Sequence, residues 1–379
     1  MRVALIHYWL VNQRGGEAVL QALCKLFPDA DIFTLFYDPQ KASPDFRAHK
    51  VTASFLNPFR RYYQSLLPLM PMALESFDLR DYDLVISSES GPAKGVLVSS
   101  EARHICYCHT PMRYLWELYP DYLNHWTASR IKRALMIPVS NYLRLWDYAS
   151  AARVDEFVAN SENVKRRIHR CYRRDAEVIH PPVAVESFFW QEPQDYYLIV
   201  SELVPYKRLD VAVQAFSANG RKLKVVGTGP QYRELRRMAA SNIEFCGRVP
   251  GSELRTLYAA SRALVMPGEE DFGITPVESL ASGKPVIAWE RGGVLETAAL
   301  AGEGGAFLYP RPTVESLQPA IERFERVESR INPELLQSST CCFSESEFLR
   351  KFRRLVDQAP HQEFLPIRTT GMVRRRIRR

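Results

Sequence analysis

The strongest constraint on the fold is a succession of short apolar runs, each followed by a glycine-containing or polar loop and a helical pattern, in both halves of the chain. In the first half, residues 2–7 are mostly apolar, a glycine pair follows, and residues 18–23 have apolar side chains at helical spacing. In the second half, the run 197–201 leads through a loop to helical spacing over residues 211–216. Buried strands that alternate with helices are typical of parallel sheets covered on both faces. The sequence therefore predicts an α/β protein with doubly wound, Rossmann-like domains.

The chain has 379 residues, which is too long for one ordinary hydrophobic core and suits two domains. Residues 184–195 contain Glu, Pro, Gln and Asp with little periodicity, as expected of an interdomain linker. We therefore expect an N-terminal domain over residues 1–184 and a C-terminal domain over residues 196–358. Residues 359–379 form a basic tail, in which no acidic residue follows Phe364.

Two glutamates lie between consecutive apolar runs in the second half. The run 263–267 and the run 285–288 are the expected buried strands, and seven residues separate Glu270 from Glu278 between them. This spacing places Glu270 on the loop after the first strand and Glu278 about one turn into the following helix. Both carboxylates then face the crevice beyond the carboxyl ends of the strands, where open parallel sheets bind ligands. A solvated loop and helix face is the alternative explanation for such a pair.

The helix between these runs begins near Phe272, Gly273, Ile274 and Thr275. The first amides of a helix have no intrahelical acceptor, and the helix dipole adds positive potential at this end. We expect these amides to suit an anion such as a diphosphate.

The whole stretch closely resembles the Glu-x7-Glu pattern of family-4 retaining glycosyltransferases. The resemblance covers about residues 1–358 and implies the GT-B fold, in which two Rossmann-like domains face each other across a cleft. It implies that the N-terminal domain binds the acceptor, that the C-terminal domain binds a nucleotide sugar, and that the final helix packs back on the N-terminal domain. It also implies that Glu270 holds hydroxyls of the donor sugar and that Glu278 holds the nucleotide ribose.

Two further segments carry this resemblance. The string from His109 to Tyr114, HTPMRY, is similar to one in bacterial mannosyltransferases of polysaccharide assembly, which implies that His109 contacts the donor sugar. Lys207 matches the lysine that binds the donor diphosphate. Many relatives have an arginine where this chain has Glu202, and we expect Arg208 or another cation to compensate for it.

The resemblance assigns weaker roles to two other segments. Gly15 and Gly16 are expected to let the backbone approach the donor diphosphate, although a plain tight turn explains them as well. Arg248 and Val249 are expected beside the base of the nucleotide.

The residues suit departure of a nucleotide diphosphate from a sugar carbon, with retention of configuration. We expect no metal and no cofactor, because the seven cysteines lack the paired spacing of a metal site and Asp81 and Asp83 precede their strand rather than follow it. Reduced cysteines suit a cytoplasmic protein. The mannosyltransferase-like strings imply GDP-mannose as the donor. They imply a polyprenyl-diphosphate-linked saccharide as the acceptor, in O-antigen or exopolysaccharide biosynthesis.

Other functions remain open at this point. One alternative is a UDP-sugar-dependent transferase of the same family, and another is a phosphorylase-like or epimerase enzyme of the same architecture. A different class is a non-enzymatic protein that binds nucleic acid or membrane through the basic tail. Sequence-independent, salt-sensitive binding that survives Glu278→Ala would indicate a nucleic-acid binder, which we do not expect.

Two segments favour peripheral attachment to the inner face of the plasma membrane. The basic tail can bind anionic headgroups, and residues 55–70 mix aromatic and aliphatic side chains with Arg60 and Arg61 over several prolines. A disordered end is the alternative for the tail. Packing against the other domain or a partner subunit is the alternative for residues 55–70.

Overall fold

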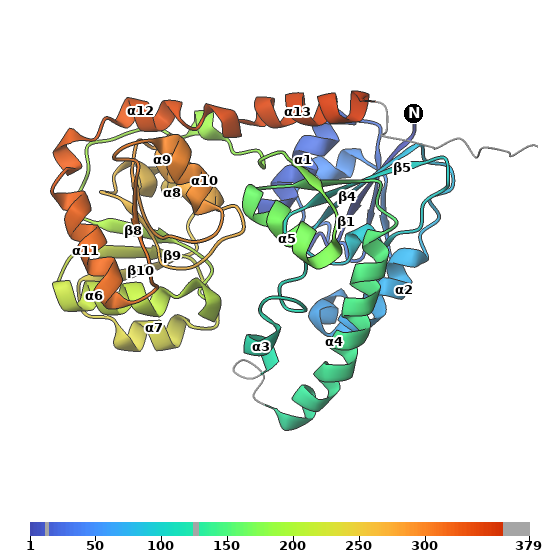
Figure 1. Ribbon diagram of the computed structural model, residues 1–379, viewed down its shortest axis with the longest axis horizontal. Helices are drawn as coiled ribbons and strands as arrows, with labels where there is room; N and C mark the ends of the chain where they lie inside the picture. Colours follow the sequence, from blue (N-terminus) through green and yellow to red (C-terminus); the bar gives the residue numbers. More distant parts are fainter. Residues whose placement is uncertain (12–14, 124–128, 359–379) are drawn as a thin grey trace, which may run out of the picture.

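The computed structural model describes residues 1–11, 15–123 and 129–358. Two lobes, each built on one parallel sheet with helices on both faces, lie next to each other (Figure 1). This arrangement confirms the expected GT-B architecture with two doubly wound domains. The basic tail, residues 359–379, lies outside the described residues.

The N-terminal sheet has seven strands in the order β3-β2-β1-β4-β5-β6-β7, and its paired strands are parallel. The strands are β1 Val3–His7, β2 Asp31–Thr34, β3 Val51–Ala53, β4 Leu84–Glu89, β5 Arg103–Cys108, β6 Glu156–Ala159 and β7 Ala176–Val178. The α-helices of this lobe are α1 Gly15–Leu26, α2 Met70–Glu75, α3 Tyr119–Asp121, α4 Arg130–Ala151 and α5 Glu162–Tyr172.

The C-terminal sheet has six parallel strands in the order β10-β9-β8-β11-β12-β13. The strands are β8 Tyr197–Val200, β9 Leu223–Val226, β10 Ile243–Gly247, β11 Leu264–Met266, β12 Val286–Trp289 and β13 Ala306–Tyr309. The helices are α6 Leu209–Asn219, α7 Tyr232–Met238, α8 Gly251–Ala259, α9 Ile274–Ala281, α10 Val294–Ala301, α11 Val314–Glu325, α12 Pro333–Ser338 and α13 Glu345–Asp357.

The strand order fixes where each sheet can bind a ligand. In the C-terminal sheet the order reverses between β8 and β11, which are neighbours although more than sixty residues separate them. The loops that leave the carboxyl ends of two such strands turn to opposite faces of the sheet and open a crevice between them. The loop after β8 carries Lys207 and the loop after β11 carries Glu270, so topology alone brings these two side chains to one crevice.

The last helix, α13, belongs to the core of the first domain. After the C-terminal lobe is complete, α12 and α13 run along one side of both lobes toward α1 (Figure 1). The side chains of Phe348, Phe352 and Leu355 are buried in the same cluster as Leu5 and Ile105 of the N-terminal sheet. An apolar stripe at helical spacing explains this placement, because it must be buried against another element.

Residues 55–70 are irregular, as their prolines indicate. They form mainly a 3₁₀ segment, η2 Asn57–Leu69, in which Phe59 and Tyr62 leave helical backbone geometry. Among the residues that the structure describes, no helix is both long and apolar enough to cross a membrane.

Candidate active site

A cleft of about 950 Å³ separates the two lobes. This volume lies at the upper end of the range that suits small-molecule and cofactor sites. Gly15, Ala18 and residues 182–184 line it from the N-terminal domain, and Ser187 and Phe188 of the linker also contribute. Its other wall comes from loops and helix ends of the C-terminal domain. Its lining includes six charged residues of that domain: Glu202, Lys207, Arg248, Arg255, Glu270 and Glu278.

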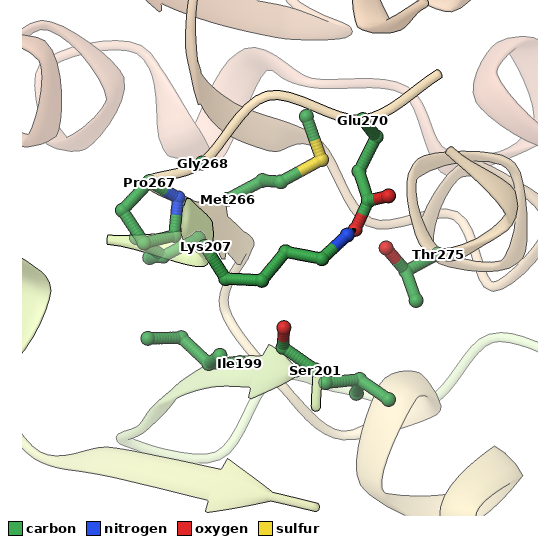
Figure 2. Close-up of a pocket in the computed structure, with 10 residues that line it drawn as sticks. Ile199, Ser201, Lys207, Met266, Pro267, Gly268, Glu270 and Thr275 are labelled. Atoms are coloured by element: carbon green, nitrogen blue, oxygen red, sulfur yellow. Dashed lines mark ion pairs between the residues drawn. The ribbon is translucent and has the colours of Figure 1, made fainter. Parts of the chain in front are cut away.

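An ion pair between Lys207 and Glu270 lies at the floor of this cleft. Figure 2 shows the two side chains pointing toward one another, with Ser201 and Thr275 nearby. Lys207 ends a short 3₁₀ turn after β8, and its backbone is so close to Gly268 that a Cβ there would approach Lys207 Cα to 2.5 Å. Glycine at position 268 is therefore what lets the two loops meet, because any larger residue would push them apart.

The N-terminus of α9 faces the N-terminal domain across the cleft. Gly273 precedes the helix with a positive φ of 90°, and Ile274 and Thr275 line the cleft. A Cβ on Gly15 would lie 2.6 Å from Ile274 Cδ1. A glycine at position 15 thus allows the first domain to approach the start of α9 closely, where unpaired amides favour an anion.

Tyr258 holds Glu278, the second of the two glutamates in the Glu-x7-Glu pattern. Its hydroxyl donates a hydrogen bond of 2.7 Å to Glu278 Oε2, and its ring is buried beneath the cleft. Burial raises the pKa of Glu278, and the hydrogen bond from Tyr258 opposes part of that rise. No sequence motif indicated Tyr258, although its place at helical spacing in the stretch before β11 marks it as an inward-facing residue.

The cations in the cleft differ partly from those expected. Arg248 and Arg255 line the cleft, whereas Arg208 does not. The Arg208 backbone is left-handed, and its guanidinium pairs with Asp210 at 3.2 Å. Compensation for Glu202, which does line the cleft, is therefore available from Arg248 and Arg255 rather than from Arg208.

His109 directly follows β5, at the carboxyl end of the N-terminal sheet. Its Nε2 lies 3.0 Å from Ser88 Oγ, and its backbone oxygen accepts a hydrogen bond from Asn160. A Cβ on Gly16 would lie 3.6 Å from His109 Nε2. His109 and Gly16 therefore form a layer behind Gly15 and do not line the cleft themselves.

The structure thus brings together many of the predicted site residues but not all of them. Those that line the cleft are Gly15, Lys207, Arg248, Val249, Glu270, Ile274, Thr275 and Glu278. Of the remainder, Phe272 is buried between His180 and Phe343, with only its backbone at the start of α9. Gly273 caps that helix without lining the cleft.

Arg167 lies on α5 of the N-terminal domain and binds the loop of the C-terminal domain that carries Glu270. It pairs with Glu269 and Asp271, the residues on either side of Glu270, and also with Glu117 at 2.9 Å. Ser161, the cap of α5, donates a hydrogen bond of 2.8 Å to the Asp271 backbone oxygen. No motif indicated Arg167, because it lies among other basic residues of a helix whose charges resemble a solvated face.

We predict that the buried histidines of the N-terminal lobe make folding sensitive to acid. Burial lowers the pKa of His109 to about 4, and burial together with His109 lowers the pKa of His7 to about 3. In the unfolded chain both titrate near 6.5. The two neutral histidines therefore make their full contribution to the free energy of unfolding above pH 6.5, and this contribution is lost as the pH falls toward 4.

In urea unfolding experiments, the free energy of unfolding should therefore decrease as the pH is lowered from 7.5 to 5. His109→Asn should flatten the slope by up to about 1.4 kcal/mol per pH unit. His169→Asn is the matched control, because the His169 side chain is 63% exposed and lies outside the buried histidine pair. An unchanged slope in His109→Asn would contradict the prediction.

Comparison with known proteins gives two family matches. The model described as Glycosyltransferase Family 4 matches residues 14–187, and the model described as Glycosyl transferases group 1 matches residues 184–334. Among solved structures, HepE of Anabaena in complex with UDP and glucose has a TM-score of 0.69 at 14% identity, covering 94% of this chain and 99% of that one. Sucrose-phosphate synthase of Thermosynechococcus elongatus has a TM-score of 0.67 at 16% identity, covering 94% and 98%. At such low identity these two structures support the fold alone.

Curated relatives include the O-antigen chain mannosyltransferase RfbU of Salmonella typhimurium, 29% identical over 50% of this chain and 57% of the relative. The D-rhamnosyltransferase WbpZ of Pseudomonas aeruginosa is 30% identical over 41% of this chain and 46% of the relative. The chain thus spans about half the length of the curated relatives it matches. The two family matches together extend from residue 14 to residue 334, and the chain belongs to the glycosyltransferases, with a family 4 domain followed by a group 1 domain.

Proposed function

We propose that this protein is a retaining hexosyltransferase that moves mannose from GDP-mannose onto a lipid-linked, polyprenyl-diphosphate saccharide. The product would serve O-antigen or exopolysaccharide assembly. The single observation that carries the proposal is the Lys207–Glu270 ion pair at the switch point of the C-terminal sheet, inside a cleft that both domains line.

The ion pair suggests how the donor is received. Without a donor, the ammonium of Lys207 and the carboxylate of Glu270 neutralise each other. A donor diphosphate competes for the ammonium and also meets the first amides of α9. Glu270 is then released to accept hydrogen bonds from sugar hydroxyls, and Glu278, held by Tyr258, is placed for the ribose.

The same groups support the chemical step. The bond between the sugar carbon and the diphosphate oxygen breaks as the acceptor oxygen forms the new glycosidic bond on the same face. The departing phosphate takes the acceptor's proton. Lys207 and the amides near Thr275 stabilise the charge on the leaving group, and Glu270 orients the oxocarbenium-like sugar. No protein nucleophile and no metal ion are required in this scheme.

His109 has a supporting role in the proposal. Its lowered pKa keeps the imidazole neutral near pH 7. A neutral ring with a hydrogen-bonding neighbour in Ser88 can orient a sugar hydroxyl but cannot supply a positive charge. Contact with the sugar would require the first turn of α1, which contains Gly16, to open a path to this ring.

The donor and acceptor identities draw on the relatives. Mannosyltransferases recur among them, including Alg2 of Saccharomyces cerevisiae and the O-antigen enzyme of Salmonella. A lipid-linked acceptor implies work at the inner face of the plasma membrane, as a peripheral cytoplasmic protein. Exposed Phe55, Phe59 and Tyr62 beside Arg60 and Arg61 suit such a surface. The basic tail would add attraction to anionic lipid.

We predict that Glu270→Gln lowers kcat by about 10²–10³-fold while donor binding is largely kept, because the interaction is needed most in the transition state. Lys207→Ala should lower both turnover and donor affinity, because the diphosphate loses its cation. Release of nucleoside diphosphate measures turnover. Glu315→Gln and Lys222→Ala are matched controls at exposed positions of the same domain and should behave as the wild type. Wild-type rates in Glu270→Gln and Lys207→Ala would refute the assigned site.

We predict that Arg167 positions Glu270 without contacting the donor. Arg167→Ala should lower kcat by about tenfold or more with a smaller change in donor KM, since a misplaced catalytic group chiefly costs turnover. Arg167→Lys should not restore it, because one ammonium cannot bridge Glu269 and Asp271 as the guanidinium fork does. Arg170→Ala, an exposed residue of the same helix, is the control. Full rescue by lysine would contradict the positioning role.

We predict that GDP-mannose raises the melting temperature more than other nucleotide sugars at the same concentration. A ligand that binds the folded state alone stabilises it by about 2.7 kcal/mol at a hundred times its Kd. A panel with GDP-mannose, GDP, UDP-glucose and UDP-N-acetylglucosamine tests this. Selective stabilisation by a UDP-sugar would replace the GDP-mannose assignment with the UDP-dependent alternative.

A further inference from the structure

A second cavity, of about 510 Å³, lies in the C-terminal lobe at the amino ends of its strands. Arg262 lies shortly before β11 and Lys284 shortly before β12, whereas the candidate active site opens at the carboxyl ends of the same sheet. Among the described residues, the two cavities share no lining residue. We call the second one the linker cavity, and its charged and indole side chains are Trp190, Glu192, Arg262, Lys284, Glu325 and Glu328.

Both segments that connect the two lobes line this cavity. Trp190 belongs to the linker, and Pro333 begins α12, which leads to α13 on the N-terminal domain. Gly283 has a positive φ of 67°, and a Cβ on it would lie 2.8 Å from Pro333 Cβ and 2.9 Å from Trp190 Cδ1. Glycine at this position therefore lets the linker and α12 pack against one turn. The walls of the linker cavity are thus fixed by close packing.

Lys284 brings an ammonium with unused hydrogen-bond donors to this cavity. The residue is only 2% exposed, and its Nζ donates one hydrogen bond of 2.7 Å to the backbone oxygen of Gln191. An ammonium has three N–H donors, and no ion pair within the described part of the chain includes Lys284. Burial lowers the pKa of Lys284 to about 8. A ligand with acceptor oxygens would therefore find donors here that the protein itself leaves unused.

Trp190 places an aromatic ring beside this ammonium. Lys284 Nζ lies over the ring, 5.2 Å from its centre, and Trp190 is nevertheless 41% exposed. Its indole N–H has no hydrogen-bond partner among the residues that the structure describes. An exposed indole combines an apolar surface with a polar N–H group. Trp190 can therefore take the apolar face of a ligand and one of its acceptors.

Arg262 holds two carboxylates at the wall of the linker cavity. Its guanidinium pairs with Glu328 at 2.5 Å and with Glu325 at 3.2 Å. The hydrogen bond from Arg221 lowers the pKa of Glu325 to about 2, so that carboxylate stays charged. A carboxylate can accept about four hydrogen bonds, so ion pairing leaves room for a ligand donor. These two side chains are thus acceptors whose orientation is already fixed.

The charges that line the cavity favour a neutral ligand over an anion. The carboxylates of Glu192, Glu325 and Glu328 face two cations, Arg262 and Lys284, so a phosphate would meet an excess of negative charge. A hydroxyl group both donates and accepts hydrogen bonds, and it can bind carboxylates and an ammonium at once. A pyranose combines such hydroxyls with an apolar C–H face that suits an indole ring.

We propose that the linker cavity binds a neutral hexopyranose of a saccharide chain, with the sugar ring against Trp190 and its hydroxyls on Lys284 and the lining carboxylates. An apolar or aromatic surface with a few convergent polar groups is the usual composition of small-molecule sites, and the cavity volume lies within their range. The site goes beyond the proposed function and rests on it only for the source of the saccharide, which is the acceptor or the product. An occupant would contact the linker and α12 together.

The experiment is saturation-transfer NMR on the full chain, which detects weak binding and shows which ligand protons contact the protein. The neutral probes are methyl α-mannopyranoside and an α-linked mannobiose, and mannose 6-phosphate is the anionic probe. The first test variant is Trp190→Leu. Phe189→Leu is its matched control, because Phe189 is 40% exposed, precedes Trp190 in the linker and does not line the cavity.

Wild type should bind both neutral sugars, and Trp190→Leu should bind them at least about tenfold more weakly, because the stacking surface is lost. Phe189→Leu should bind as wild type does. Glu192→Ala should also weaken binding, whereas Glu186→Ala, at an exposed linker position outside the cavity, should not. Melting temperatures check that the variants fold, and Glu192→Ala decides the matter if Trp190→Leu does not fold.

Lys207→Ala separates the linker cavity from the candidate active site. Sugar binding should persist in this variant, because Lys207 lines the other cleft and not this cavity. The measurement needs no nucleotide sugar and no turnover. Failure of the saccharide site and failure of the proposed reaction are therefore distinct results.

Three results would overturn the proposal. The first is no saturation transfer from wild type to either neutral sugar, or wild-type binding in both Trp190→Leu and Glu192→Ala. The second is loss of binding in Lys207→Ala, which would place the sugar in the active-site cleft. The third is tighter binding of mannose 6-phosphate than of methyl α-mannopyranoside, which would make the cavity an anion site centred on Lys284.

Discussion

The contact between Lys207 and Glu270 depends on the order of the strands more than on either residue. Because β8 and β11 are neighbours in the sheet, the loops that follow them leave from adjacent carboxyl ends and reach the same crevice. Gly268 lets those loops approach closely enough for the side chains to pair. The two charges pair at the floor of the cleft. In the proposed function, an incoming diphosphate would meet a cation that is already held in place. The same topology explains why the start of α9 and Glu278 lie within reach of that point.

The N-terminal domain contributes to this site mainly through the loop that carries Glu270. Arg167 binds the residues on both sides of that glutamate, and Ser161 binds the backbone of Asp271. Gly15 meets Ile274 at the opposite wall. A change in the separation of the lobes would therefore move the loop of Glu270 directly. The proposed site would therefore link turnover to the arrangement of the two domains through these contacts.

Much of the fold was accessible from the sequence because its elements are local. Apolar runs with glycine-containing loops indicated β1, β11 and β12. The pairing of Lys207 with Glu270 could not be predicted, because it depends on β8 and β11 being neighbours in the sheet and no local sequence pattern specifies strand order. Arg167 resembled its exposed neighbour Arg170, and only the other domain distinguishes them.

The route of α13 has a consequence for biosynthesis. The first domain takes Phe348, Phe352 and Leu355 into its core, and these residues leave the ribosome only after the whole C-terminal lobe. Until then, the nascent N-terminal sheet has an apolar groove beside α1 that nothing in its own sequence fills. The first half of the protein must therefore wait for the second, and a chain truncated before residue 345 would present that groove to chaperones.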